Sequence, residues 1–238
     1  MGFNRIIRLK LSMRTYVNIP NDNKHSIINS MLALIDSHTS VEGYRDAFYQ
    51  LGKALGLLLS HQMHDKLGNT MLACASEDAD WLVHGVLNSL TQKKVSLAVF
   101  WNERLSFDAE KKIEYSPIVK SYIEPIHNCE TLILVKSIIS TSCVVKTQLT
   151  RLVNEITPKY IFVVSPVMYK DAESNLKMEF PEDISNKFNF LTFAIDTERD
   201  EHGQVIPGIG GMVYPKLGLG DIHEKNRYIP HLVRERTK

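Results

Sequence analysis

The stretch from residue 131 to residue 156 constrains the fold of this chain most strongly. Residues 132–135 form an unbroken aliphatic run, which is typical of a strand buried on both faces. Small hydroxyl residues follow at 140–142, and then a helical pattern whose apolar side chains share one face: Val145, Leu149, Leu152, Val153 and Ile156. A strand, a small-residue turn and a helix start predict an anion site, because the first amides of a helix lack internal partners.

The rest of the chain repeats this alternation of apolar runs and helical patterns. The patterns predict helices over residues 26–37 and 41–63 and around Leu82–Leu90, and strands over residues 70–73, 95–101, 160–164 and 190–195. We expect the strand at 160–164 to end at Ser165 and Pro166. Strands that alternate with helices predict an α/β fold, a parallel sheet flanked by helices.

Two further segments have no such pattern. Residues 102–125 are polar and irregular, which predicts a protruding arm. Residues 201–220 are rich in glycine and contain two prolines, which indicates an ordered loop. The acidic residues near that loop, among them Asp196 and Glu198, fit a solvated loop better than a metal cage.

Composition excludes several function classes. With Lys+Arg 28 against Asp+Glu 27, the net charge of +1 gives no basis for nucleic-acid binding, although Arg5, Arg8, Lys10 and Arg14 cluster near the start. Three scattered cysteines suit neither a disulfide framework nor a zinc site, so we expect no metal and a reducing, cytoplasmic location. No apolar run approaches the roughly 20 residues of a membrane helix, so no membrane contact is expected.

Residues 193–211, FAIDTERDEHGQVIPGIGG, carry a family resemblance. They are similar to the stretch of the uracil phosphoribosyltransferases that reads Asn-Glu-His-Gly and then Ile-Pro-Gly-Leu-Gly. In that family the loop forms a hood over the pyrimidine and recognises the base largely through main-chain groups. Glycines suit this task because they let the backbone approach a flat ligand. The resemblance implies base contacts at Val205, Gly210, Gly211 and Met212.

The resemblance covers most of the chain and implies its organisation. Residues 84–87, His-Gly-Val-Leu, stand where the family has Asp-Gly-Val-Leu. The implied fold is a type I phosphoribosyltransferase-like core at 39–221, with the hood at about 196–221 and a protruding arm. Residues 1–38 then form an N-terminal extension and residues 222–238 a C-terminal tail. The family is dimeric through its arm, which implies a homodimer or a dimer with a catalytic paralogue.

The segment after residue 135 resembles a degraded form of the family's phosphate loop. There the strand ends in an acidic residue, and the loop reads Ala-Thr-Gly-Gly followed by a hydroxyl residue. Here Lys136 replaces the acid, Ser142 and Cys143 replace the glycines, and only Thr141 keeps the family residue. The resemblance places the phosphate loop on these residues: Lys136, Ser137, Ser140, Thr141, Ser142, Cys143 and Val144.

Other charged positions of the family are lost as well. Phosphoribosyl diphosphate is polyanionic, so its site needs positive charge on the phosphates and a carboxylate on the ribose. Glu77 and Asn102 stand where the family has arginines, and Gly211 replaces an acidic residue of the hood. We therefore expect that ordinary use of phosphoribosyl diphosphate is lost.

Lys136 could acquire a new role. It is expected to face Glu77, Asp78 or Asp80 across the cleft, either as an ion pair that fills a dead site or as a pocket for a zwitterionic or cationic ligand. A base-and-acid pair for different chemistry is a further alternative. Cys143, at a helix start, is either a nucleophile or a small buried side chain. The catalytic candidates are thus Lys136, Glu77, Asp78 and Cys143, with roles unassigned.

These inferences predict a binding or regulatory homologue of uracil phosphoribosyltransferase. Its expected partner is a pyrimidine-like or other small planar ligand, and no cofactor is expected. Two alternatives stay open: an active uracil phosphoribosyltransferase of pyrimidine salvage whose lost contacts are replaced, and a repurposed enzyme that uses Lys136 and the acidic loop.

Overall fold

The computed structural model describes residues 13–237 except 64–67, 91–93, 104 and 109–112. The basic residues Arg5, Arg8 and Lys10 therefore lie outside the described residues. Across the described part of the chain, no helix combines the length and the apolar character needed to cross a membrane.

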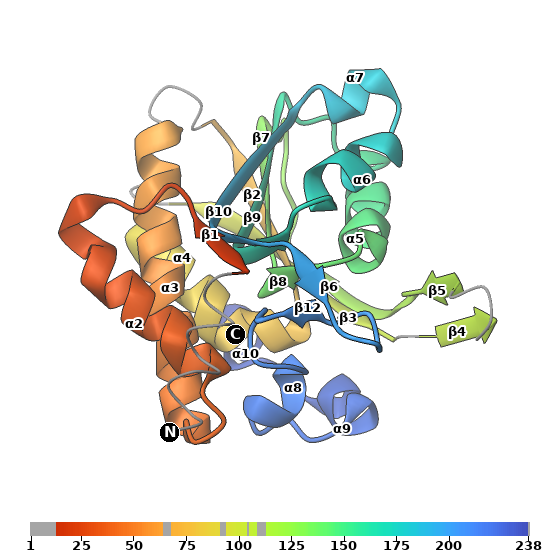
Figure 1. The fold of residues 1–238 in the computed structure, drawn as a ribbon. Coiled ribbons are helices and arrows are strands. Elements are labelled where there is room, and N and C mark those ends of the chain that lie inside the picture. The colour runs from red at the N-terminus through yellow and green to blue at the C-terminus, as the bar shows by residue number, and fades with distance from the viewer. Residues whose placement is uncertain (1–12, 64–67, 91–93, 104, 109–112, 238) are drawn as a thin grey trace, which may run out of the picture.

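One mostly parallel sheet runs through the molecule (Figure 1). Its parallel strands follow the order β3-β2-β7-β9-β10, with these bounds: β2 (Thr70–Ala75), β3 (Val95–Asn102), β7 (Thr131–Val135), β9 (Tyr160–Tyr169) and β10 (Phe188–Asp196). Antiparallel strands close both edges, β6 (Ile118–Ile123) beside β3 and β1 (Arg14–Tyr16) beside β10. The predicted α/β class with a parallel sheet is confirmed.

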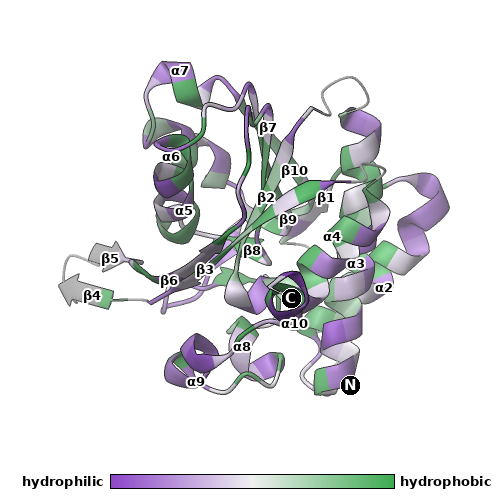
Figure 2. Cartoon of the chain, turned by 180° about the vertical axis from the view of Figure 1, so that it is seen from behind, coloured by the Kyte–Doolittle hydropathy of each residue, from purple (hydrophilic) through white to green (hydrophobic). Residues whose placement is uncertain are grey.

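Helices cover both faces of this sheet (Figure 1). One layer holds α2 (Lys24–Ile35), α3 (Val41–Gln62) and α4 (His84–Ser89), and the other holds α5 (Cys143–Val153), α6 (Ala172–Met178) and α7 (Glu182–Ser185). Successive strand residues point to opposite faces, so Leu72 packs in the core under α3 whereas Met71 and Ala73 pack in the core under α5. The hydropathy colouring of Figure 2 shows green strands between the two layers. Burial on both faces explains why these strands are continuous apolar runs.

The strand order reverses beside β2. The chain passes from β2 to β3 on one side, and β7 then pairs with β2 on the other side. In open parallel sheets of this kind, ligands bind in the crevice beyond the carboxyl ends of the strands where the order reverses. This crevice lies between the turn η2 (Ser76–Asp78), which follows β2, and residues Lys136 and Ser137, which follow β7. The fold thus brings the predicted acidic loop and the predicted phosphate loop together.

The described parts of both terminal segments pack against the core. A short 3₁₀ turn, η1 (Asn21–Asn23), precedes α2, and Ile27, Met31 and Leu34 of α2 enter the same core as α3. At the other end, α9 (Ile222–Arg227) begins with a capping box between Asp221 and Glu224, and α10 (His231–Arg236) follows. Such a D-x-x-E pattern is a sequence signal for a helix start.

Strand β9 does not end at Ser165 and Pro166 as predicted, but continues to Tyr169. The reason lies in its neighbours. Strand β7 ends opposite Val164, and the short β8 (Ile138–Ile139) begins opposite Val167. Pro166 lies opposite the gap between β7 and β8. No strand pairs with it on that side, so its lack of an N–H loses no hydrogen bond between strands there.

The segment expected to be irregular contains three strands. Strands β4 (Leu105–Asp108) and β5 (Ile113–Tyr115) form a hairpin that projects from the body, and β6 joins the sheet (Figure 1). The expected loop at 201–220 contains β12 (Val205–Ile206), paired with β11 (Glu198–Arg199), and the short helix α8 (Val213–Lys216). Helix α5 ends at Val153, so Ile156 lies beyond it.

Candidate functional site

A cavity of about 130 Å³ lies at the crevice where the strand order reverses. Its lining comes from the turn after β2, the end of β3, the loop after β7, the start of α5, the hood and α9. The phosphate-loop residues in its wall are Lys136, Ser137, Ser140, Thr141 and Val144. The hood contributes Val205, Gly211 and Met212. Most of the residues that the resemblance implied therefore meet around one cavity.

Three implied residues do not line the cavity. Ser142 caps the start of α5 without a side-chain hydrogen bond to the helix, and Cys143 is the first residue of that helix. Gly210 packs against α2 instead, because a Cβ atom there would lie 2.2 Å from the carbonyl oxygen of Leu34. Gly211 is different, since it has a positive φ of 111° and open space beside its Cα. The hood backbone is thus exposed to the cavity at Gly211.

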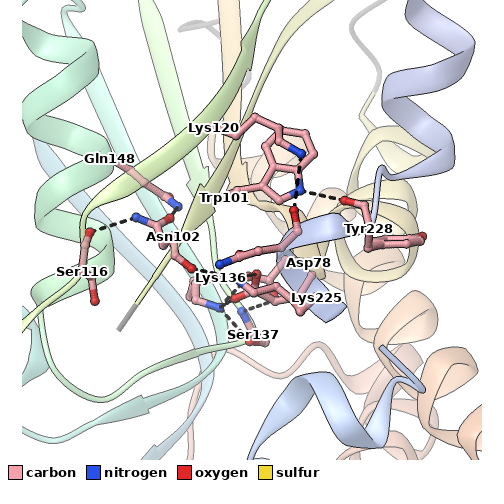
Figure 3. A network of polar contacts seen from close by, with 12 residues as sticks. Asp78, Trp101, Asn102, Ser116, Lys120, Lys136, Ser137, Gln148, Lys225 and Tyr228 are labelled. Carbon is pink, nitrogen blue, oxygen red and sulfur yellow. Dashed lines mark hydrogen bonds and ion pairs between the residues drawn. The ribbon is translucent and has the colours of Figure 1, made fainter. Parts of the chain in front are cut away.

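A buried ion cluster forms the polar end of the cavity, where Glu77, Lys136 and Lys225 are part of the lining. Figure 3 shows the polar network around Lys136. Nζ of Lys136 donates to Oδ2 of Asp78 at 2.7 Å and to Oε1 of Glu77 at 3.2 Å. It also donates to the hydroxyl of Ser137 at 3.2 Å, whose own amide donates to Oδ1 of Asp78 at 3.2 Å. Lys136 therefore faces Glu77 and Asp78, which is one of the arrangements that the sequence allowed.

Asp80 points away from this cluster. Its carboxylate accepts hydrogen bonds from the amides of His231 at 2.8 Å and Leu232 at 2.9 Å, and from the hydroxyl of Tyr228. It thereby satisfies the first amides of α10. Glu77 and Asp78 are buried in the cluster and Asp80 binds the C-terminal segment, so Lys136 does not face Asp80.

A lysine that sequence reasoning missed completes the cluster. Lys225 of α9 is 1% exposed, and its Nζ donates to the carbonyl oxygen of Asn102 at 2.7 Å. The same Nζ lies 3.6 Å from Oε2 of Glu77. The capping box at Asp221 predicts a helix here, but nothing in the local sequence shows that this helix reaches the end of β2.

The side chain of Asn102 is held by its neighbours rather than offered to a ligand. Its amide donates to the carbonyl oxygen of Ser116 at 3.1 Å, and its Oδ1 accepts from Nε2 of Gln148 at 2.8 Å (Figure 3). Asn102 stands where the family resemblance expects an arginine, and it brings no charge to the cavity.

Burial and mutual attraction set the pKa values of the cluster. Burial would raise the pKa of Glu77, but the charges of Lys136 and Lys225 outweigh it and hold that pKa at about 2. Burial would lower the pKa of Lys136, but Asp78 and Glu77 raise it above the usual value. Burial lowers the pKa of Lys225, and burial together with the charge of Glu77 raises the pKa of Asp78. Two carboxylates and two ammonium groups leave the cluster without net charge.

Ionic and polar contacts fix the hood over the cavity. Arg14 of β1 makes two hydrogen bonds of 2.7 Å to Asp196, and Asp196 also accepts from the amide of Gly208 at 2.8 Å. Asp196 is fully buried, so its expected place in a solvated loop is wrong. Farther along the hood, Arg199 donates to the carbonyl oxygen of Ser140 at 2.7 Å and lies over the ring of Tyr169. The hood is therefore bound both to an edge strand and to the phosphate loop.

The described residues contain no group of three or more His, Cys, Asp or Glu side chains that could hold a metal ion. Apolar side chains also line the cavity, with Ile209 and Tyr214 buried and Ile222 half-buried. The cavity thus combines a neutral polar end with apolar walls and exposed hood backbone, which suits a small, flat, uncharged molecule.

Comparisons with known proteins show the fold. No protein-family model and no curated protein matches the sequence. Among solved structures, the chain is similar to the AQ2163 protein from Aquifex aeolicus, with 14% identity and a TM-score of 0.65 over 85% of this chain and 97% of that chain. The two proteins share a fold, and identity this low shows nothing more.

Phosphoribosyltransferases are also among the solved structures that the chain resembles. Orotate phosphoribosyltransferase from Mycobacterium tuberculosis, in complex with 5-phospho-α-D-ribosyl 1-diphosphate, matches with 9% identity and a TM-score of 0.41 over 70% of this chain and 87% of its own. Hypoxanthine-guanine phosphoribosyltransferase from L. donovani matches with 8% identity and a TM-score of 0.42 over 66% and 81%. Nothing about activity or substrate follows from likeness at this level.

Proposed function

We propose that this protein is a diverged homologue of uracil phosphoribosyltransferase that binds a pyrimidine-like or other small planar ligand and no longer uses phosphoribosyl diphosphate in the ordinary way. The ligand occupies the cavity beneath the hood, and its binding serves regulation rather than nucleotide synthesis. The proposal places the protein in the cytoplasm, as a homodimer or a dimer with a catalytic paralogue.

One observation carries the loss of the transferase reaction. Lys136, the cation of the phosphate loop, is buried between Asp78 and Glu77 and bonded to both. Nζ of Lys225 lies 3.6 Å from Oε2 of Glu77. A diphosphate entering this end would meet a cluster whose positive charge is already neutralised, and it would have to displace a carboxylate from a buried ammonium group. Breaking a buried pair in this way costs about 3–5 kcal/mol.

The backbone of the hood supports the proposal of a planar ligand. Gly211 and Val205 line the cavity, and the positive φ at Gly211 leaves its backbone open to the cavity. Main-chain donors and acceptors at such a surface match the edge of a flat heterocycle, and the buried Ile209 and Tyr214 provide apolar contact for its faces.

The alternative of new chemistry built on Lys136 has weaker support. Because Asp78 and Glu77 raise the pKa of Lys136, its amine stays protonated and cannot act as a general base or as a nucleophile. Cys143, the other nucleophile candidate, does not line the cavity. The cluster therefore favours binding over catalysis.

Isothermal titration with uracil and with phosphoribosyl diphosphate tests the proposal. We expect heat of binding for uracil and none for phosphoribosyl diphosphate. A coupled assay for uridine monophosphate supplies the decisive control. Turnover of uracil to its nucleotide would establish the active transferase instead, and the absence of binding by any planar heterocycle would refute the ligand assignment.

A further inference from the structure

Glu77 and Lys225 place a negative and a positive group side by side in the cavity wall. Oε2 of Glu77 and Nζ of Lys225 are 3.6 Å apart, and both residues line the cavity. This separation is beyond hydrogen-bond length, so the two groups attract each other but leave each other's hydrogen-bonding capacity unused.

Oε2 of Glu77 is a buried acceptor that lacks a donor. The other oxygen of this carboxylate binds Lys136, but Oε2 has no hydrogen-bond partner among the described residues. The Glu77 side chain is only 8% exposed, so bulk water does not solvate it freely. An unsatisfied buried carboxylate oxygen is costly, and it marks a position where a bound molecule would supply an N–H or O–H group.

Lys225 is a matching donor with capacity to spare. An ammonium group carries three N–H donors, and one of them is used by the carbonyl oxygen of Asn102. Figure 2 shows α9 as largely hydrophilic, yet Lys225 is turned inward and almost fully buried. The capping box of Asp221 and the hydrogen bond from Trp101 to the carbonyl oxygen of Tyr228, at 2.7 Å, hold both ends of this helix in place. The lysine is therefore positioned by the fold.

Building on the proposed function, we propose that Glu77 and Lys225 bind the lactam edge of a planar heterocycle. The ring N–H donates to Oε2 of Glu77, and the neighbouring carbonyl oxygen accepts from Nζ of Lys225. An acceptor beside a donor complements this edge, which presents a donor beside an acceptor. Both protein groups are side chains, so this contact is separate from the main-chain contacts implied for the hood.

The charge of the cluster restricts the ligand further. Two carboxylates and two ammonium groups are balanced when the cavity is empty, so an ionic ligand would add an uncompensated charge to a buried site. A neutral lactam keeps the balance and satisfies Oε2 of Glu77. The site accordingly takes uncharged lactams, such as oxopyrimidines, and rejects both phosphorylated and cationic forms.

Titration calorimetry with uracil and 1,3-dimethyluracil tests this assignment on the unmodified protein. The two molecules have similar flat rings, but dimethylation removes every ring N–H and therefore every lactam edge. We expect uracil to bind about tenfold more tightly or better, because a hydrogen bond to a charged group contributes roughly that much. 1-Methyluracil and 3-methyluracil, which each keep one N–H, identify the edge that is read.

A variant ties the preference to Lys225. In Lys225→Met we expect uracil to lose much of its advantage over 1,3-dimethyluracil, because the lactam edge docks on Glu77 and Lys225 as a unit, whereas Lys225→Arg keeps donors and retains more of the preference. Lys146→Met, at an exposed pair with Glu179, is the matched control and leaves the preference unchanged. Thermal melting establishes that each variant is folded, and if Lys225→Met is not, the reduced preference of Lys225→Arg decides.

Two results would overturn the assignment and can be told apart. Equal binding of uracil and 1,3-dimethyluracil, or an unchanged preference in Lys225→Met, removes the lactam contact and leaves the planar-ligand proposal standing. Failure of uracil, 1,3-dimethyluracil and every other planar heterocycle to bind the unmodified protein removes both proposals.

Discussion

Nζ of Lys136 lies 2.7 Å from Oδ2 of Asp78, and the two residues follow neighbouring parallel strands at the point where the strand order reverses. The pair therefore occupies the position in which an open α/β sheet normally holds its ligand. Because both side chains are buried, the pair is a structural part of the site as well as a chemical one.

Replacement of Lys136 by methionine is expected to destabilise the protein strongly. Loss of the ammonium leaves Glu77 and Asp78 buried with too little positive charge, and removal of one partner from a buried pair costs about 3–5 kcal/mol. Urea unfolding of Lys136→Met measures this change. Lys146→Met, at an exposed pair, should change the free energy of unfolding by less than about 1 kcal/mol. Equal effects in the two variants would contradict a buried cluster.

Acid should weaken the contribution of Glu77 to stability. Its pKa is lowered from 4.5 to about 2 in the folded protein, so the folded state binds this proton less readily than the unfolded state does. The resulting stabilisation is fully present above the unfolded value and is lost as the pH falls toward about 2. A pKa shift of this size corresponds to a contribution of roughly 3 kcal/mol to the free energy of unfolding.

Glu77→Gln isolates this effect, because the amide does not titrate. The difference in unfolding free energy between the unmodified protein and Glu77→Gln should shrink as the pH falls from about 5 to about 2. A difference that stays constant over this range would show that Glu77 titrates normally. Asp46→Asn, at an exposed side chain bonded to Gln50, serves as the control and should show little pH dependence.

The sheet and its main helices could be predicted from the sequence because their signals are local. The aliphatic run of β7 and the apolar stripe of α5 are read from consecutive residues. The course of β9 through Pro166 could not be read in this way. It depends on the gap between β7 and β8, which only the assembled sheet reveals.

The candidate site was predictable only in part, because it also depends on contacts between residues far apart in the sequence. The resemblance implied that Lys136, Ser140 and Gly211 belong to one site, and all three line the same cavity. Nothing near Glu77 in sequence shows that it is buried, because the groups that neutralise it come from β7 and α9. Lys225 was missed since its segment falls outside the resemblance, and a lone lysine on a polar helix is normally solvated.

Arg14→Met should loosen the hood. Arg14 binds Asp196, whose carboxylate also accepts from the amide of Gly208, so the variant leaves a fully buried carboxylate without its cation. We expect a loss of about 3–5 kcal/mol in stability and faster hydrogen exchange at residues 208–211. Arg151→Met, at an exposed pair with Glu155, is the control. Unchanged exchange in the hood would mean that β1 does not hold it.

Asp80→Asn should release the C-terminal segment from the site. The carboxylate accepts from the amides of His231 and Leu232 and from the hydroxyl of Tyr228, and an amide side chain keeps only one oxygen for these donors. We expect a loss of about 1–3 kcal/mol and faster proteolysis after residue 221. The affinity for uracil should also fall in Asp80→Asn, because α9 positions Lys225 in the cavity lining.

The loss of uracil affinity in Asp80→Asn distinguishes between two roles of the C-terminal segment. If the segment only covers the core, Asp80→Asn weakens uracil and 1,3-dimethyluracil to the same extent. If it delivers a ligand-binding group, the variant weakens uracil more, because uracil docks on Glu77 and Lys225 together through its lactam edge, which 1,3-dimethyluracil lacks. Asp171→Asn, at the start of α6 and away from the cavity lining, is the control for introducing an amide and should leave both affinities unchanged. Normal proteolysis together with a normal uracil affinity in Asp80→Asn would show that contacts other than Asp80 hold Lys225 in place.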